Sequence, residues 1–259
     1  GEEEFKYTFG CQVPESEAVD ASYFGDALFI GDSRTLGFCN YTAITKYCYA
    51  RVSLNIKSVL TTAFIEDTYA GQKVTRTVLD TVRQYPKAFG KIYIGFGTNE
   101  YSWAGTTFIA CYEYFINELR SILPEDVPIY IQSVLPVNEA AARRNGYRLT
   151  NSELDAQNKL LADMTKELGI YFVNTAEAIS ADDSFSLPDG IAGDGVHLNK
   201  PGCQQIKDYI YTHTARPEKP EETEETEETE ETTKTEETTA AEETTIAVET
   251  AEPALQGNL

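Results

Sequence analysis

The segment that decides the fold is residues 27–34, which read ALFIGDSR. Its first part, Ala27 to Ile30, is continuously apolar and suits a short strand that is buried on both faces. The polar residues that follow, Asp32 and Ser33, are typical of a helix N-terminus, where backbone N–H groups point outward. We therefore predict a strand, a tight turn and a helix, with Ser33 at the junction.

Similar apolar runs recur along the chain and predict the rest of a sheet. They lie at residues 49–54, 91–96, 127–134 and 170–173, and the first of these is the weakest. Strands without polar alternation are typical of parallel sheets that helices cover on both faces. The chain is therefore expected to form one parallel sheet of five strands.

Helical periodicity fills the intervals between several of these strands. Apolar residues repeat in steps of three, four or seven over residues 108–122, 154–168 and 203–213, which gives each segment one apolar stripe. Pro124 and Gly169 lie just beyond two of these segments, where helices commonly end. Alternating strands and helices predict a three-layer α/β/α sandwich of the flavodoxin-like kind, with the parallel sheet in the middle.

The C-terminal segment differs in composition from the rest of the chain. Residues 216–259 contain 15 Glu and 3 Lys or Arg, largely as Glu-Glu-Thr repeats, in a 259-residue chain of net charge −21. Like charges and few apolar residues leave nothing to offset the entropy of ordering. We expect a lead-in over residues 1–24, a folded domain over 25–215, and a disordered acidic tail over 216–259. The tail would act as a stalk or linker to a surface or another domain, or only as a solubilising extension.

Charge and hydropathy exclude several classes of function. Neither part of the chain has a basic stripe, so we expect no nucleic-acid partner, and an anionic membrane surface would repel the protein. No apolar run approaches the ~20 residues that span a bilayer. The chain opens at Gly1 without Met, so we expect a processed or trimmed chain from which any export signal or anchor could have been cut away. An extracellular or cell-surface location, as for a secreted bacterial protein, is the expectation.

The five cysteines are scattered and include no C-x-x-C pair. They are Cys11, Cys39, Cys48, Cys111 and Cys203. Their spacing predicts neither a disulfide framework nor a zinc site, so most are expected to be small buried side chains. Cys39 and Cys48 are the one pair that could form a disulfide outside the cell. No cluster of His, Cys and carboxylates suggests a metal, and we expect no cofactor.

Three polar clusters follow predicted strands or precede the last helix. They are residues 31–34 (GDSR), 97–100 (GTNE) and 193–199 (GDGVHLN). Active sites of open α/β sheets lie at the carboxyl ends of the strands. His197, one of two histidines, follows Asp194 by three residues, a spacing that lets a carboxylate orient an imidazole. Taken separately, each cluster could also be only a helix cap or a loop hydrogen bond.

The order of the clusters resembles that of the SGNH (GDSL-like) hydrolase superfamily, over roughly residues 25–214. The Gly-Asp-Ser of residues 31–33 resembles the block that carries the family's nucleophile. Residues 97–100 resemble its Gly-x-Asn-Asp block, and residues 194–197 resemble its Asp-x-x-His block. Three short blocks in this order on the expected elements form a more specific signal than any one of them.

The resemblance implies an SGNH-type fold and ester hydrolysis through an acyl-enzyme, with a catalytic triad of Ser33, His197 and Asp194. It also implies an oxyanion hole made by the backbone N–H groups of Ser33 and Ser53 and by the side chain of Asn99. No cofactor and no metal are implied.

Three residues depart from the family pattern. Arg34 replaces the Leu of the Gly-Asp-Ser-Leu block, and Glu100 replaces the last Asp of Gly-x-Asn-Asp. Ser53 stands at the best match to the family's intervening Gly. Since a serine also has the backbone N–H that this glycine supplies, the oxyanion hole can be retained.

Four residues near the blocks are candidate substrate contacts. Arg34 is either a solvated cation on the first helix or a partner for an anionic group of the substrate. Trp103, the only tryptophan, either stacks on a sugar or acyl group or packs over the edge of the site. Glu100 and Asn138 are the other two candidates, because both are predicted to lie near the carboxyl ends of the strands.

The expected function is a secreted or surface-tethered serine esterase. Its substrate would be a small acyl ester, with acetyl groups on a polysaccharide as the favoured choice. Two alternatives stay open on the sequence. One is a non-catalytic carbohydrate-binding module on an esterase fold, and the other is an acyltransferase that uses the same triad.

Overall fold

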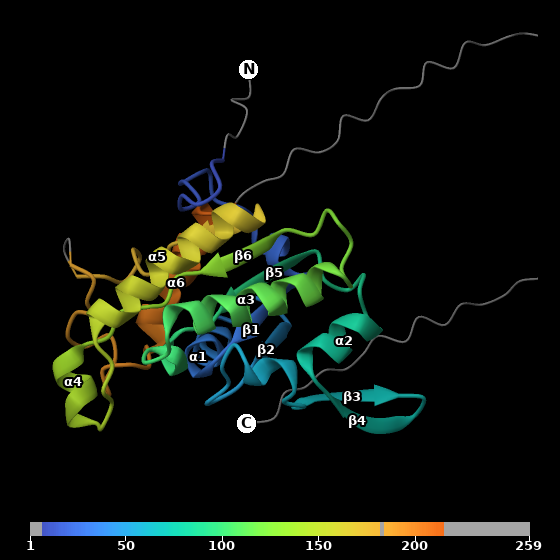
Figure 1. Cartoon of the computed structure of the whole chain (residues 1–259), viewed down its shortest axis with the longest axis horizontal. Helices are drawn as coiled ribbons and strands as arrows, with labels where there is room; N and C mark the ends of the chain where they lie inside the picture. The colour runs from blue at the N-terminus through green and yellow to red at the C-terminus, as the bar shows by residue number, and fades with distance from the viewer. Residues whose placement is uncertain (1–6, 182–183, 215–259) are drawn as a thin grey trace, which may run out of the picture.

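A parallel five-stranded sheet forms the centre of the molecule (Figure 1). The computed structural model describes residues 7–181 and 184–214. The strands are β1 (Ala27–Gly31), β2 (Tyr47–Ala50), β5 (Lys91–Gly95), β6 (Ile129–Gln132) and β7 (Tyr171–Val173). They lie in the order β2-β1-β5-β6-β7, and all neighbouring pairs are parallel. The predicted sheet is confirmed, whereas the tail expected at residues 216–259 lies outside the described residues.

Helices cover both faces of this sheet. They are α1 (Ser33–Thr42), α2 (Val78–Gln84), α3 (Gly105–Arg120), α4 (Glu139–Arg144), α5 (Asn151–Leu168) and α6 (Lys200–Thr212). Short 3₁₀ turns are η1 (Ala21–Phe24), η2 (Ser58–Leu60) and η3 (Thr98–Glu100). Within residues 7–181 and 184–214, no helix is both long and apolar enough to cross a bilayer.

Alternate strand residues face opposite layers, which produces the predicted sandwich. Leu28 and Ile30 of β1 join the core with α2, α3 and α5, whereas Phe29 joins the core with α1 and α6. On the second face, Phe29 stacks on Tyr93 with ring centroids 4.6 Å apart, and Tyr93 stacks on Tyr130 at 4.5 Å. In Figure 1, α3 and α5 lie in front of the sheet. Burial on both faces explains why these strands are continuously apolar.

Two local features differ from the sequence prediction. The strand expected at residues 49–54 is β2, which ends at Ala50, because the following residues turn back with Leu54 N–H donating to the Arg51 carbonyl at 3.2 Å. An antiparallel hairpin of β3 (Ile65–Tyr69) and β4 (Gln72–Arg76) was not predicted. It projects beside α2 at the lower right of Figure 1.

The N-terminal segment packs on the folded body. Val13 is fully buried, and its N–H donates to the carbonyl of Phe172 in β7 at 2.8 Å. Further along, the N–H groups of Ser16 and Val19 donate to the carbonyls of Thr212 and Tyr211, the last two residues of α6, at 2.7 and 2.8 Å. The folded body therefore includes residues before 25, where the lead-in was expected to end.

A pair of glycine substitutions tests the packing at the β1–α1 junction. A side chain at Gly31 would clash with Thr35 Oγ1 and lie 2.5 Å from the carbonyl oxygen of Gly95. Gly37, inside α1, has nothing within 4 Å of an added Cβ. We expect Gly31→Ala to lower the free energy of unfolding by ~1–3 kcal/mol and Gly37→Ala to raise it by ~0.5–1 kcal/mol. Urea unfolding of both variants measures the difference, and equal effects would contradict this packing.

Candidate active site

Ser33 lies at the start of α1, directly after the turn that ends β1. The side chain of Asp32 caps this helix, with Oδ1 accepting the N–H of Arg34 at 2.8 Å. Asp32 is only 2% exposed, and donor groups of Thr35 and Thr98 nearby also favour its charged form. Burial raises the pKa of Asp32 in spite of these donors. The half-buried Ser33 is thereby held at a helix N-terminus by backbone geometry.

The structure brings Ser33, His197 and Asp194 into one hydrogen-bonded chain. Ser33 Oγ lies 2.9 Å from His197 Nε2, and His197 Nδ1 lies 2.6 Å from Asp194 Oδ2. Asp194 Oδ1 accepts the N–H groups of His197 at 2.8 Å and Val196 at 2.9 Å. An Nδ1–H that donates to the carboxylate leaves Nε2 as an acceptor for the serine hydroxyl.

The Asp194 carboxylate is poised to stay charged. Burial opposes its charge, but hydrogen bonds from the His197 side chain and from two backbone N–H groups outweigh burial and lower the pKa of Asp194 to about 2. Tyr147, which the sequence reasoning missed, reaches the same oxygen from the loop after α4, with its hydroxyl 3.4 Å from Oδ2. Its ring also meets the His197 ring edge-on, with centroids 6.1 Å apart.

Ser53 and Asn99 lie in loops that meet at the end of β1. The N–H of Arg51, just past β2, donates to the carbonyl of Gly31 at 3.3 Å. Asn99 Nδ2 donates to the carbonyl of Leu54 at 2.8 Å. Ser53 has a φ of 63°, in the left-handed region that favours glycine. In the described part of the chain, no acceptor is found for the backbone N–H of Ser33 or Ser53.

The prediction that Glu100 contacts substrate is wrong. This residue is fully buried, and its carboxylate accepts the N–H of Ile56 at 2.6 Å and the N–H of Gly97 at 3.0 Å. Burial, reinforced by the nearby charge of Asp32, raises the pKa of Glu100 to about 7 although these hydrogen bonds oppose the rise. A side chain with no exposed surface cannot meet a substrate from solvent.

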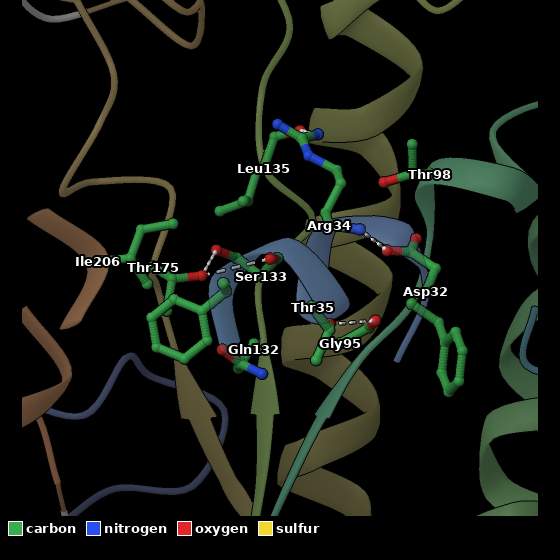
Figure 2. A pocket seen from close by; sticks show the side chains of 12 residues that line it. Asp32, Arg34, Thr35, Gly95, Thr98, Gln132, Ser133, Leu135, Thr175 and Ile206 are labelled. Atoms are coloured by element: carbon green, nitrogen blue, oxygen red, sulfur yellow. Dashed lines mark hydrogen bonds between the residues drawn. The ribbon is translucent and has the colours of Figure 1, made fainter. Parts of the chain in front are cut away.

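The interpretation of Arg34 as a solvated cation is also wrong, whereas its contact with an anionic group of a substrate stays a prediction. Arg34 is 7% exposed, so it is no solvated cation, and its guanidinium donates to the carbonyls of Leu135 and Pro136, both at 2.7 Å. Figure 2 shows the side chain extending from α1 toward Leu135. Burial lowers the pKa of Arg34 to about 10, which leaves it charged at neutral pH. Since both terminal nitrogens bond to backbone, the residue ties α1 to the loop after β6.

The remaining candidate contacts serve the fold. Trp103 is half-buried against the core beside α3, as its packing interpretation predicted. Asn138 caps α4 by accepting the Ala141 N–H at 3.0 Å, and its Nδ2 donates to Asp189 at 2.8 Å. One amide hydrogen and the carbonyl oxygen of Asn138 are therefore used within the protein, and a contact between Asn138 and a substrate stays a prediction.

A small cavity lies at the start of α1, where it is lined by Asp32 and Arg34, the residues on either side of Ser33 (Figure 2). Its volume is about 40 Å³, and both polar and apolar side chains line it, including Asp32, Arg34, Ser133, Phe38 and Ile206. Neither Ser33 nor His197 lines it, and its size suits a few water-sized molecules. It is therefore distinct from the surface that a substrate would approach.

The described residues offer no obvious metal-binding cluster and no disulfide. Across residues 7–181 and 184–214, no group of three or more His, Cys, Asp or Glu side chains could hold a metal ion. All five cysteines are free thiols, including Cys39 on α1 and Cys48 on β2, so the suggested disulfide is not formed.

Sequence comparison assigns the chain to a family. The model of the GDSL-like Lipase/Acylhydrolase family matches residues 29–205, which include Ser33, Asn99, Asp194 and His197. This chain belongs to the GDSL-like Lipase/Acylhydrolase family. The resemblance to SGNH (GDSL-like) hydrolases is thereby confirmed. A comparison with curated proteins finds no match.

Solved structures of GDSL-like and related proteins share the fold at low sequence identity. A protein provisionally described as a platelet activating factor from Streptococcus pneumonia aligns with a TM-score of 0.57 and 19% identity, over 72% of this chain and 82% of its own. A GDSL-like lipase from Bacteroides thetaiotaomicron VPI-5482 aligns with a TM-score of 0.51 and 14% identity, over 74% and 86%. These similarities establish the α/β architecture of the family in this chain.

Replacing Arg34 by the residue typical of the family should destabilise this chain. In Arg34→Leu the carbonyls of Leu135 and Pro136 lose their donors inside the protein, so we expect the free energy of unfolding to fall by ~2–4 kcal/mol. Urea unfolding measures the loss. Arg83→Leu is the control, because the Arg83 side chain is 51% exposed in its ion pair with Asp80, and it should change stability by less than ~0.5 kcal/mol. Equal effects would refute a structural role for Arg34.

The raised pKa of Glu100 predicts a pH-dependent stability. Its pKa is about 7 in the folded chain against a usual value of 4.5, so the folded state holds the proton more tightly. Stability from this group is full below pH ~4.5 and is lost as pH rises toward ~7. Relative to Glu100→Gln, wild-type unfolding free energy should fall by up to ~3 kcal/mol across that window. Urea unfolding of both proteins at several pH values tests this, and a constant difference would contradict it.

Proposed function

We propose that this GDSL-like protein is a serine esterase that hydrolyses small acyl esters through Ser33, His197 and Asp194. The observation that carries the proposal is the 2.9 Å contact between Ser33 Oγ and His197 Nε2, with Asp194 2.6 Å behind the ring. His197 takes the hydroxyl proton as Ser33 attacks the ester carbonyl, and Asp194 stabilises the imidazolium. The proton then passes to the departing alkoxide, and water activated by His197 releases the acyl group from Ser33.

The proposed oxyanion hole consists of the backbone N–H groups of Ser33 and Ser53 and the side chain of Asn99. Support comes from the position of these groups around the end of β1, where Asn99 donates one amide hydrogen to Leu54 and keeps the other free. Donors fixed in advance toward the developing negative charge stabilise a tetrahedral intermediate more than the substrate.

We extend the proposal to acetyl or similar small acyl groups on carbohydrate, in a secreted or surface-linked protein. The His197 side chain is 40% exposed, so an ester on a large polymer can approach it. The Glu- and Thr-rich composition of residues 216–259 is typical of a stalk or linker, which favours a surface polymer as substrate. A panel of esters from acetyl to long-chain, on simple and sugar alcohols, tests this choice. The fastest turnover on long-chain esters would overturn it.

Removing the nucleophile tests the central claim. We expect Ser33→Ala to lower kcat/KM for p-nitrophenyl acetate by ~10⁴-fold or more, because no other described hydroxyl lies against His197 Nε2. Initial rates of wild type and variant measure the loss. A serine-directed fluorophosphonate should label the wild type at Ser33 and leave the variant unlabelled.

Ser121→Ala is the matched control, because Ser121 lies at the end of α3 and bonds only to the carbonyl of Glu118 through its hydroxyl. It should keep wild-type rates and labelling. Equal rates for wild type and Ser33→Ala, or no activity of either on the ester panel, would favour a non-catalytic binding module instead.

A further inference from the structure

The buried carboxylate of Glu100 joins two loops that leave different strands. Oε1 accepts the N–H of Ile56 at 2.6 Å, and Oε2 accepts the N–H of Gly97 at 3.0 Å. Ile56 belongs to the loop that follows β2 and contains Ser53, whereas Gly97 opens the turn after β5 that contains Asn99. One side chain therefore holds both loops.

The strand order places this link across the nucleophile. In the sheet, β1 lies between β2 and β5, and its end carries Asp32 and Ser33. Loops after β2 and β5 can meet only by passing over the end of β1. The Asn99 contact with the Leu54 carbonyl at 2.8 Å is a second link between the same loops. Together the two links join the loops that follow β2 and β5, the strands on either side of the one that leads to Ser33.

We propose that Glu100 is a positioning residue that sets the distance between Ser53 N–H and the Asn99 side chain, and so shapes the oxyanion hole. This inference rests on the proposed esterase function. A carboxylate is suited to the task because it can accept both N–H groups at once through charge-assisted hydrogen bonds. An aspartate at this position would be shorter by one methylene, about 1.5 Å, and would not span both loops.

The backbone of Glu100 is held independently of its carboxylate. Its carbonyl accepts Gln157 Nε2 at 2.9 Å from α5 and the Trp103 N–H at 2.8 Å. The backbone of Glu100 is therefore attached to α5, whereas its carboxylate is attached to the loops after β2 and β5. In Glu100→Gln one oxygen remains an acceptor, while the amide nitrogen turns its hydrogens toward the other N–H, which loses its partner.

A double-mutant cycle with Asn99→Ala tests the proposal at pH 8.5, above the Glu100 pKa of about 7. We expect Glu100→Gln to lower kcat for p-nitrophenyl acetate by ~10-fold or more with KM changed less than ~3-fold. Asn99→Ala should cost ~10²–10³-fold in kcat in the wild type but less than ~10-fold in the Glu100→Gln background, because the donor is already misplaced. If the loss of kcat in the double variant equals the product of the losses in Glu100→Gln and Asn99→Ala, the proposal is overturned.

Glu100→Asp keeps the charge and provides a second route to the same answer. Because an aspartate is too short to reach both loops, it should lower kcat and couple to Asn99→Ala as Glu100→Gln does, and it carries the test if the Gln variant does not fold. Thr165→Val is the matched control, since it removes a buried hydroxyl that donates to Ala162 at 2.7 Å in the second half of α5. Thr165→Val should lower only the melting temperature. Asn99→Ala should therefore lower kcat by the same factor in the Thr165→Val background as in the wild type.

The outcomes separate this proposal from the function on which it rests. If Ser33→Ala is as active as the wild type, the esterase assignment fails. If Ser33 is required but Glu100→Gln retains full kcat, only the positioning role of Glu100 fails.

Discussion

The buried carboxylate of Asp32 fixes the junction between β1 and α1, and the geometry of the site depends on it. It accepts the N–H of Arg34 at 2.8 Å, and Thr98, which belongs to the turn after β5, lies near enough to favour its charged form. Gly31 has no side chain, so Thr35 and the carbonyl of Gly95 can lie close to its backbone. At this point β1 pairs with β5. Ser33 is therefore positioned by backbone and sheet, and only His197 and Asp194 come from a loop.

Three charged side chains lie buried around the end of β1, and backbone groups supply most of their hydrogen-bond partners, although Nε of Arg34 is buried without one among the described residues. Asp32 and Glu100 accept N–H groups, and Arg34 donates to two carbonyls. An unpaired buried charge costs several kcal/mol, so each of these groups ties its partner segments firmly to the end of the sheet. The same hydrogen bonds that remove this cost also connect α1 with the loops after β2, β5 and β6. Order at the site thus comes from polar contacts inside the protein rather than from apolar packing alone.

The sequence predicted the sheet because its strands are buried on both faces, as Ala27–Gly31 illustrates. It did not predict the β3–β4 hairpin, in which Asp67 points inward to bond Arg76 at 3.0 Å and Tyr85 at 2.9 Å and so breaks the apolar alternation. Motif order brought out Ser33, Asp194 and His197 as candidates, since their chemistry requires particular residue types. The placement of Arg34, Glu100 and Tyr147 depends on contacts between segments far apart in the chain, and no local pattern encodes such contacts.

The parallel bridge between Gln12 and Phe172 has a consequence for how molecules of this protein meet one another. Strand β7 ends the five-stranded sheet, and an outermost strand with free backbone groups is a template for pairing with a neighbouring chain. Here the segment around Val13 occupies those groups on the same molecule. Cleavage of that segment would leave a short, partly aromatic strand open to pairing with another chain, so residues 12–13 cover this edge of the sheet as well as contributing to the core.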